Sequence, residues 1–258
     1  MVLLGDYHTH TIYTHGHGTV EDNIKVAIKR GLKQIAITEH SFSQMFYGIN
    51  KKEYNEMRVE IESLRKKYAG QIDILCGLES NLQDLKGTID LPPENRKIVD
   101  ILVVGFHNLG RPKNIKAFFN FWVPNVLGIG RHSKKQIERN TQMYIDAIKT
   151  NQIDIISHLN THGCLVDPVK VAAVAKEYNT YIELNGKVIN FSDEQMRDMI
   201  ATGVKFIIDS DAHYSDRVGK NPRGLNFVEK YNIPVEQVAN LGKIPMFKTY
   251  NLDKGVKY

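Results

Sequence analysis

Four histidines lie close together near the start of the chain, in the stretch G-D-Y-H-T-H-T-I-Y-T-H-G-H-G at residues 5–18. They are His8, His10, His15 and His17. His8 and His10 are two residues apart, so on an extended segment both rings project to the same side. Neutral imidazole is the commonest metal ligand in proteins. The spacing favours a shared metal site, although isolated pairs of this kind also occur by chance.

Further residues of metal-binding type follow apolar segments along the chain. They are Glu39 and His40 after 34–38, Glu79 after 72–78, His107 after 99–105, His158 after 153–157, Glu183 and Asn185 near the end of 180–184, and Asp211 and His213 after 204–209. A lone His107 or His158 is more often a hydrogen-bonded polar residue than a ligand. Their joint position at the ends of predicted strands is the stronger signal.

Seven short apolar segments alternate with amphipathic helical patterns and would position these side chains. The first lies near residue 4, and the other six are those just described. Strands that are almost continuously apolar are typical of a parallel sheet or barrel covered on both faces. In such βα folds the carboxyl ends of the strands and the loops after them meet at one rim. The pattern therefore predicts that the histidines and carboxylates converge there.

Local signals mark the helices between these strands. Three polar residues each precede a capping-box partner by three positions: Thr19 with Asp22, Ser133 with Gln136, and Ser192 with Gln195. The pair Asp167-Pro168 predicts another helix start, and Gly31, Gly70 and Gly203 follow helical patterns. The segment 109–131 departs from the alternation of strands and helices. It contains Phe118, Phe119, Phe121 and Trp122. Its length indicates a lid, an interface or an embedded extra helix, with local packing of the aromatics as the alternative.

Composition narrows the class of protein. A chain of 258 residues leaves one large or two small domains open; we interpret it as one domain, with a barrel at about 2–230 and a C-terminal extension at about 231–258. No apolar run could span a bilayer and no secretion signal is recognisable, so we expect a cytoplasmic protein.

Cys76 and Cys164 are too few for a disulfide framework. The net charge of +5 favours anionic partners, but the basic residues are scattered, which weakens nucleic acid as a partner.

Seven short motifs together resemble those of a known family. In order they are D-Y-H-T-H at 6–10, T-E-H at 38–40, G-L-E at 77–79, F-H at 106–107, S-H at 157–158, E-L-N at 183–185 and S-D-A-H at 210–213. The ordered set is similar to the motifs of the PHP (polymerase and histidinol phosphatase) metal-dependent phosphoesterases, from Gly5 to about Gly224. The resemblance implies a distorted seven-stranded (β/α)7 barrel, an α/β fold, with a trinuclear metal centre at its C-terminal rim.

The resemblance also implies a set of ligands for each ion. The first ion would be held by His8, His10, Glu79 and Asp211, the second by Glu79, His107 and His158, and the third by His15, His40 and His213. Family members usually place the loop histidine six residues after the second motif histidine, whereas here His15 is five and His17 seven residues after it. The T-H-G context favours His15. The mixture of nitrogen and oxygen ligands suits zinc, manganese or iron.

The function implied is hydrolysis of the phosphate monoester of a small metabolite by a metal-bound hydroxide. Glu79, Asp211 and His213 would take the catalytic roles, with Asp211 or a nearby histidine protonating the leaving group. Asn185, Arg217 and Arg223 are candidates for substrate binding, and Arg217, Arg223 and Arg131 are candidates for a phosphate clamp. A solvated surface charge is the commoner role for each of these arginines. The alternatives are histidinol phosphatase specifically, a phosphodiesterase or exonuclease on nucleic-acid ends, an amide hydrolase and a non-catalytic metal-binding domain. Homo-oligomerisation is left open.

Overall fold

The computed structural model describes residues 2–250 and contains the seven predicted strands. They are β1 (Gly5–Asp6), β2 (Gln34–His40), β3 (Asp73–Asn81), β4 (Ile101–Gly105), β5 (Ile155–Ile156), β6 (Tyr181–Asn185) and β7 (Phe206–Asp209). All neighbouring pairs are parallel and the order is β1-β2-β3-β4-β5-β6-β7. The (β/α)7 fold is therefore confirmed.

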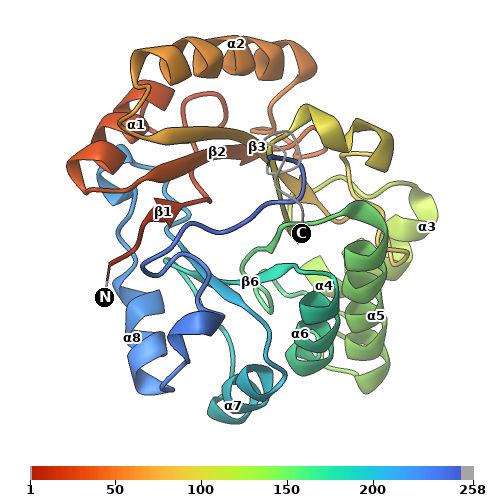
Figure 1. Cartoon of the computed structure of the whole chain (residues 1–258). Coiled ribbons are helices and arrows are strands. Elements are labelled where there is room, and N and C mark those ends of the chain that lie inside the picture. The colour runs from red at the N-terminus through yellow and green to blue at the C-terminus, as the bar shows by residue number, and fades with distance from the viewer. Residues whose placement is uncertain (1, 251–258) are drawn as a thin grey trace.

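The sheet curves into a nearly closed barrel with helices outside it (Figure 1). Beyond the ends of β1 and β7, Thr9 and Ala212 form a parallel bridge, and the amide of His10 donates to the Ala212 carbonyl at 2.8 Å. The segment carrying the two motif histidines is thus fixed directly against the segment carrying Asp211.

Within residues 2–250, eight α-helices lie around the barrel, and four of them start at the predicted caps Thr19, Ser133, Asp167 and Ser192. They are α1 (Val20–Lys29), α2 (Lys51–Lys67), α3 (Ile115–Ala117), α4 (Val123–Val126), α5 (Lys134–Asn151), α6 (Pro168–Glu177), α7 (Asp193–Ala201) and α8 (Pro222–Lys230). The capping boxes at Thr19 and Ser192 are complete. At Ser133 only the hydroxyl accepts a bond, from the amide of Gln136, because the Ser133 amide donates to the Gly130 carbonyl at 2.9 Å instead.

Strands β2 and β3 extend further than predicted. His40 is the last residue of β2, and Glu79 lies inside β3, opposite His40 in the parallel register. Both were expected just after the strands. Because a paired strand is more rigid than a loop, this extension holds the two side chains next to each other at the rim.

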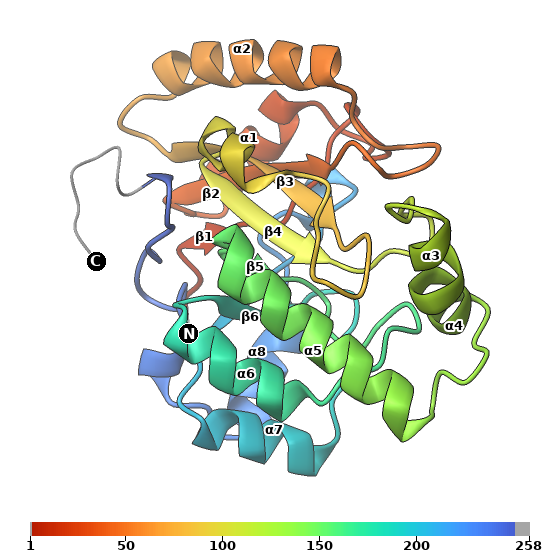
Figure 2. The same ribbon diagram turned by 90° about the vertical axis from the view of Figure 1, so that its right-hand side faces the viewer.

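The segment 109–131 contains an embedded helix, as one of the predicted alternatives had it. Helices α3 and α4 are joined by a π-helical turn at Phe118–Trp122. Phe121 is buried against Phe106, with ring centroids 5.3 Å apart, and the Trp122 indole donates to the Asn108 carbonyl at 3.0 Å. Figure 2 shows α3 and α4 on the side toward which the arrowheads of β2 and β4 point. The embedded helix therefore stands beside the rim.

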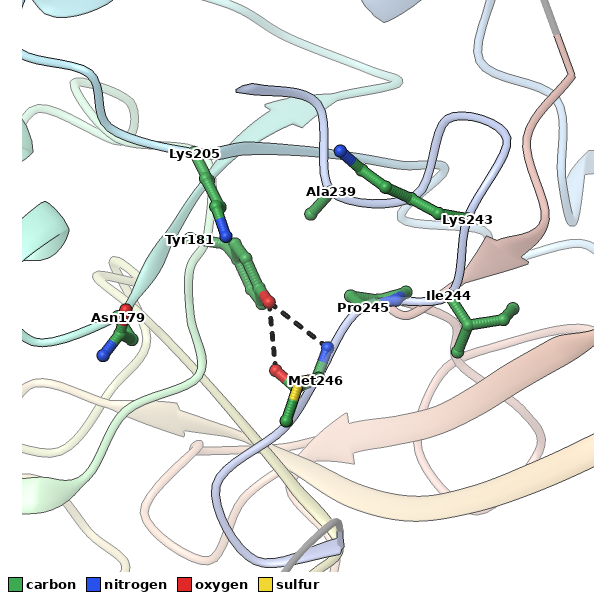
Figure 3. A pocket seen from close by; sticks show the side chains of 8 residues that line it. All are labelled: Asn179, Tyr181, Lys205, Ala239, Lys243, Ile244, Pro245 and Met246. Atoms are coloured by element: carbon green, nitrogen blue, oxygen red, sulfur yellow. Dashed lines mark hydrogen bonds between the residues drawn. The ribbon is translucent and has the colours of Figure 1, made fainter. Parts of the chain in front are cut away.

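The C-terminal segment closes the opposite end of the barrel. Phe247 is fully buried, with its ring centroid 4.8 Å from that of Tyr7 and 6.1 Å from that of Tyr181. It completes an inner core made of residues from the strands, among them Ala36, Leu75, Ile101, Val103, Ile155 and Ile207. The Tyr181 hydroxyl donates to the Met246 carbonyl at 3.0 Å beside a cavity of about 360 Å³ (Figure 3). Residues 251–258 of the predicted extension lie outside the described residues.

Within residues 2–250, no helix combines the length and apolar character that a membrane crossing needs. Cys76 and Cys164 are both buried and free. Two buried thiols without a disulfide agree with the prediction that the cysteines form no disulfide framework.

Candidate metal centre

The carboxylate of Glu79 is the centre of the rim. Five imidazole nitrogens lie within 3.6 Å of its two oxygens. They are Nε2 of His8 at 3.2 Å, Nε2 of His10 at 3.6 Å, Nδ1 of His40 at 2.9 Å, Nε2 of His107 at 3.2 Å and Nε2 of His158 at 2.8 Å. Residues far apart in the sequence therefore converge on one fully buried carboxylate, as the strand-end pattern predicted.

Several polar atoms in this cluster are buried without a hydrogen-bond partner among the described residues. They include Nε2 of His8, Nε2 of His10, Nδ1 of His40 and Oε2 of Glu79. Buried polar atoms are normally satisfied, because leaving one unpaired costs about 1–3 kcal/mol. Lone pairs that point together into one small region are the arrangement that divalent cations satisfy. The donor set therefore fits metal ions.

The outer nitrogens of three rings are held by neighbouring side chains. Nδ1 of His8 donates to Glu183 at 2.7 Å, and Nδ1 of His107 donates to Asn81 at 2.7 Å. Nδ1 of His158 is 3.1 Å from the hydroxyl of Thr161. A ring that keeps its proton on Nδ1 presents the Nε2 lone pair to the centre. These contacts therefore fix both the tautomer and the direction of the ring.

Asp211 completes the group around His8 and His10. Its Oδ1 atom is 3.9 Å from Nε2 of His8 and 3.6 Å from Nε2 of His10. The ligand atoms of these three residues lie within 4.8 Å of one another, as do those of His40, Glu79 and His107. Asp211 has a φ of 50°, which is uncommon for a residue other than glycine. Such local strain is often found at functional sites.

A third group contains His15 rather than His17. The His15 ring is 4.8 Å from the ring of His40 and 4.1 Å from that of His213, whereas His17 stacks on Tyr214 at 4.3 Å. The ligand atoms of His10, His40 and His213 also lie within 4.8 Å of one another. The geometry therefore favours His15 over His17 at the third position.

The imidazoles of this third group are held neutral. Burial, followed by the charge of His10, lowers the pKa of His213 to about 2 and that of His15 to about 4. The same two causes hold the pKa of His40 well below its usual value. A neutral imidazole keeps the lone pair that metal binding requires.

The carboxylates are held in the ionised form. Burial opposes ionisation of Glu79, but His107, His8 and His40 outweigh it and keep the pKa of the carboxyl well below its usual range. Burial likewise opposes ionisation of Asp211, and His8, His10 and Lys187 lower its pKa. Asp211 is therefore suited to be an anionic ligand rather than the proton donor considered from the sequence.

The structure does not place the predicted substrate-binding residues at an open face of the cluster. Asn185 is fully buried, and its amide donates to Glu183 at 2.9 Å and to Asp211 at 3.2 Å. Arg217 is exposed beside Asp216. The chain after His213 runs along α1 as far as Arg30, whose guanidinium donates to the Asp216 carbonyl. This path carries Arg217 away from the cluster.

The other two predicted arginines are not paired with the carboxylates of the cluster either. Arg223 is exposed in the first turn of α8 and forms no ion pair with a carboxylate of the cluster. Arg131 donates to the backbone carbonyls of Asn125 and Val126, at 2.7 and 3.3 Å. The contact of these arginines with a phosphate group, expected from the sequence, has no support in their positions.

Three residues beside the cluster were missed from the sequence. The Lys187 ammonium lies 2.9 Å from Oδ1 of Asp211, and the His162 ring lies 5.1 Å from that of His158. The Tyr47 ring is 4.4 Å from that of His15. Lys187 lies in the loop after β6, and His162 lies in the loop after β5. A search of the sequence that included the first few loop residues after each predicted strand would have found both.

Comparison with known proteins identifies the family of this chain. The PHP domain matches residues 6–194, so the chain belongs to the PHP domain family. A protein of Caldanaerobacter subterraneus subsp. tengcongensis, named a probable phosphatase, is 31% identical over 92% of this chain and 87% of its own length. A second probable phosphatase, from Thermoanaerobacter sp. (strain X514), is 32% identical over 95% of this chain and 94% of its own.

A solved structure shares the fold at low sequence identity. It is a histidinol phosphate phosphatase from Lactococcus lactis, complexed with zinc, L-histidinol and phosphate. The TM-score is 0.59 with 16% identity, and the match covers 91% of this chain and 95% of that one. The similarity supports the barrel architecture.

Replacing Glu183 with Gln is expected to lower metal affinity by about 10- to 100-fold, because the neutral amide holds the His8 ring less firmly and reduces its basicity. Glu183 also accepts the amide of His158 at 2.7 Å, so the same change loosens a second ring. Metal titration of the purified variant measures the effect. The control is Glu177→Gln, which alters an exposed carboxylate at the end of α6. Equal affinities in the two variants would show that Glu183 does not orient the ligands.

Proposed function

We propose that this protein hydrolyses phosphate monoesters of small metabolites, and that three divalent ions, of zinc, manganese or iron, occupy the rim. The broader class, the metal-dependent phosphatases of the PHP family, follows from the family match and the relatives named probable phosphatases. The observation that carries the proposal is the convergence of five imidazoles on the single carboxylate of Glu79.

The proposed ligand sets are those that the family resemblance implies, and the proximity of the side chains supports them. His8, His10, Glu79 and Asp211 would hold the first ion, Glu79, His107 and His158 the second, and His15, His40 and His213 the third. When bound, the ions would polarise the phosphate ester and lower the pKa of water, which supplies a nucleophile at neutral pH. The chain itself contributes ionised carboxylates, neutral imidazoles and the side chains that orient them. Asp211 acts in this scheme as a ligand.

A phosphorylated metabolite is the proposed partner, and the cytoplasm the proposed compartment. Two buried, free cysteines agree with a reducing environment. A homo-oligomer stays a prediction from the sequence.

Phosphate release from p-nitrophenyl phosphate, bis(p-nitrophenyl) phosphate and a panel of metabolite monoesters tests the reaction class. Histidinol phosphate belongs in the panel because the Lactococcus lactis structure holds L-histidinol and phosphate. We expect turnover of monoesters after addition of manganese or zinc, with little turnover of the diester. Preferential cleavage of the diester, or release of nucleotides from nucleic-acid ends, would instead favour the phosphodiesterase alternative.

A further inference from the structure

Lys187 brings a positive charge to the rim of the metal centre. Its ammonium lies 2.9 Å from Oδ1 of Asp211 and 2.6 Å from Nδ1 of His213. Among residues 2–250, no other lysine or arginine is within 4.0 Å of the carboxylates of Glu39, Glu79, Glu183 or Asp211. Among the described lysines and arginines, Lys187 is therefore the one that lies at the cluster.

The backbone of Lys187 is held rigidly although its side chain is partly free. Its amide donates to Oδ1 of Asn185 at 2.8 Å, and the Val188 amide donates to the same atom at 3.1 Å. Gly186 packs so closely that a Cβ there would come within 2.7 Å of the Ser210 carbonyl oxygen. The buried Asn185 therefore forms a turn that directs the following lysine to the rim.

The side chain retains capacity for a ligand. It is 48% exposed, whereas that of Asp211 is 11% exposed. An ammonium group has three N–H donors, and the contacts with Asp211 and His213 engage two of them. A lysine placed only to neutralise a buried carboxylate would be expected to bury its ammonium with it. This one faces both the cluster and solvent, where a substrate would enter.

We propose that Lys187 binds the phosphoryl group of the substrate. The inference rests on the proposed phosphatase function and assigns to Lys187 the role that the sequence had suggested for Arg217 and Arg223. A lysine binds phosphate as a point charge through charge-assisted hydrogen bonds. Its place beside Asp211 and His213 puts this charge next to two proposed ligands, where a phosphate group bound at the metals must lie.

The test compares Lys187→Met and Lys187→Arg with the parent protein, all loaded with manganese. Lys170→Met serves as the matched control, because Lys170 is 66% exposed on α6. The readouts are KM and kcat for a monoester, competitive inhibition by inorganic phosphate, metal content, and calorimetric binding of inorganic phosphate. We expect Lys187→Met to raise KM and to weaken phosphate binding by about 10- to 100-fold with metal content retained. Lys187→Arg should restore much of the loss.

The outcomes separate this inference from the proposed function. Unchanged KM and unchanged phosphate binding in Lys187→Met would overturn the role of Lys187 even if the parent is an active phosphatase. Loss of metal from Lys187→Met would also overturn it, because the lysine would then support the ligands instead. If the parent cleaves no monoester, the phosphatase proposal fails, yet phosphate binding by the parent and not by Lys187→Met still supports Lys187 as the anion-binding residue.

Discussion

Replacing Glu79 with Gln is expected to remove most of the bound metal and to lower kcat/KM for phosphate monoesters by more than about 100-fold, the upper limit for losing a partner that only orients a ligand. The reason is the position of its carboxylate, within 3.6 Å of five imidazole nitrogens. An amide has no negative charge to share between two cations, and its NH₂ group would face lone pairs or metal ions. Metal analysis and kinetics on the same preparation measure both effects.

Glu56→Gln is the matched control, because Glu56 is 55% exposed on α2 and its replacement should alter neither metal content nor kcat/KM. Circular dichroism of Glu79→Gln checks that the barrel is folded. A variant that keeps its full metal content and loses only activity would contradict the assignment of Glu79 as a shared ligand.

Replacing Phe247 with Ala is expected to lower the free energy of unfolding by about 3–5 kcal/mol, the cost of removing a large buried aromatic ring and leaving a cavity. Phe247 is fully buried between Tyr7 and Tyr181 at the end of the barrel opposite the metal centre. Urea unfolding measures the loss. At temperatures where the variant stays folded, KM should not change, since the ring lies far from the rim.

Val235→Ala is the control for this loss, because Val235 is 54% exposed and its truncation should change stability by less than about 0.5 kcal/mol. A loss below about 1 kcal/mol in Phe247→Ala would mean that the C-terminal segment does not contribute to the core as the structure has it.

Much of the fold could be predicted because the pattern of apolar segments is regular. Strands buried on both faces must be nearly continuously apolar, so segments such as 34–38 and 99–105 were recognisable. The parallel arrangement then brings all strand ends to one rim, which is why His40, Glu79 and His158 could be grouped although they are far apart in the sequence.

Which side chains reach the rim from the loops is hard to predict from sequence, because it depends on the paths of those loops. Arg217 follows the motif histidine His213 closely, but the chain turns down along α1 and carries it away from the rim. Lys187 reaches the rim because Asn185 accepts two backbone amides and turns the chain. Neither path leaves a periodic signal in the sequence. The packing of Phe247 into the barrel is likewise a long-range contact without a local signature.

The most direct test of the central claim is removal and return of metal. The purified protein is stripped with a chelator, its metal content is measured by mass spectrometry, and phosphate release from a monoester is followed as manganese or zinc is titrated back. The account predicts that activity disappears with the metal and returns as binding approaches about three ions per chain. Full activity in the stripped protein, or one retained ion with no turnover of any phosphate ester, would contradict it.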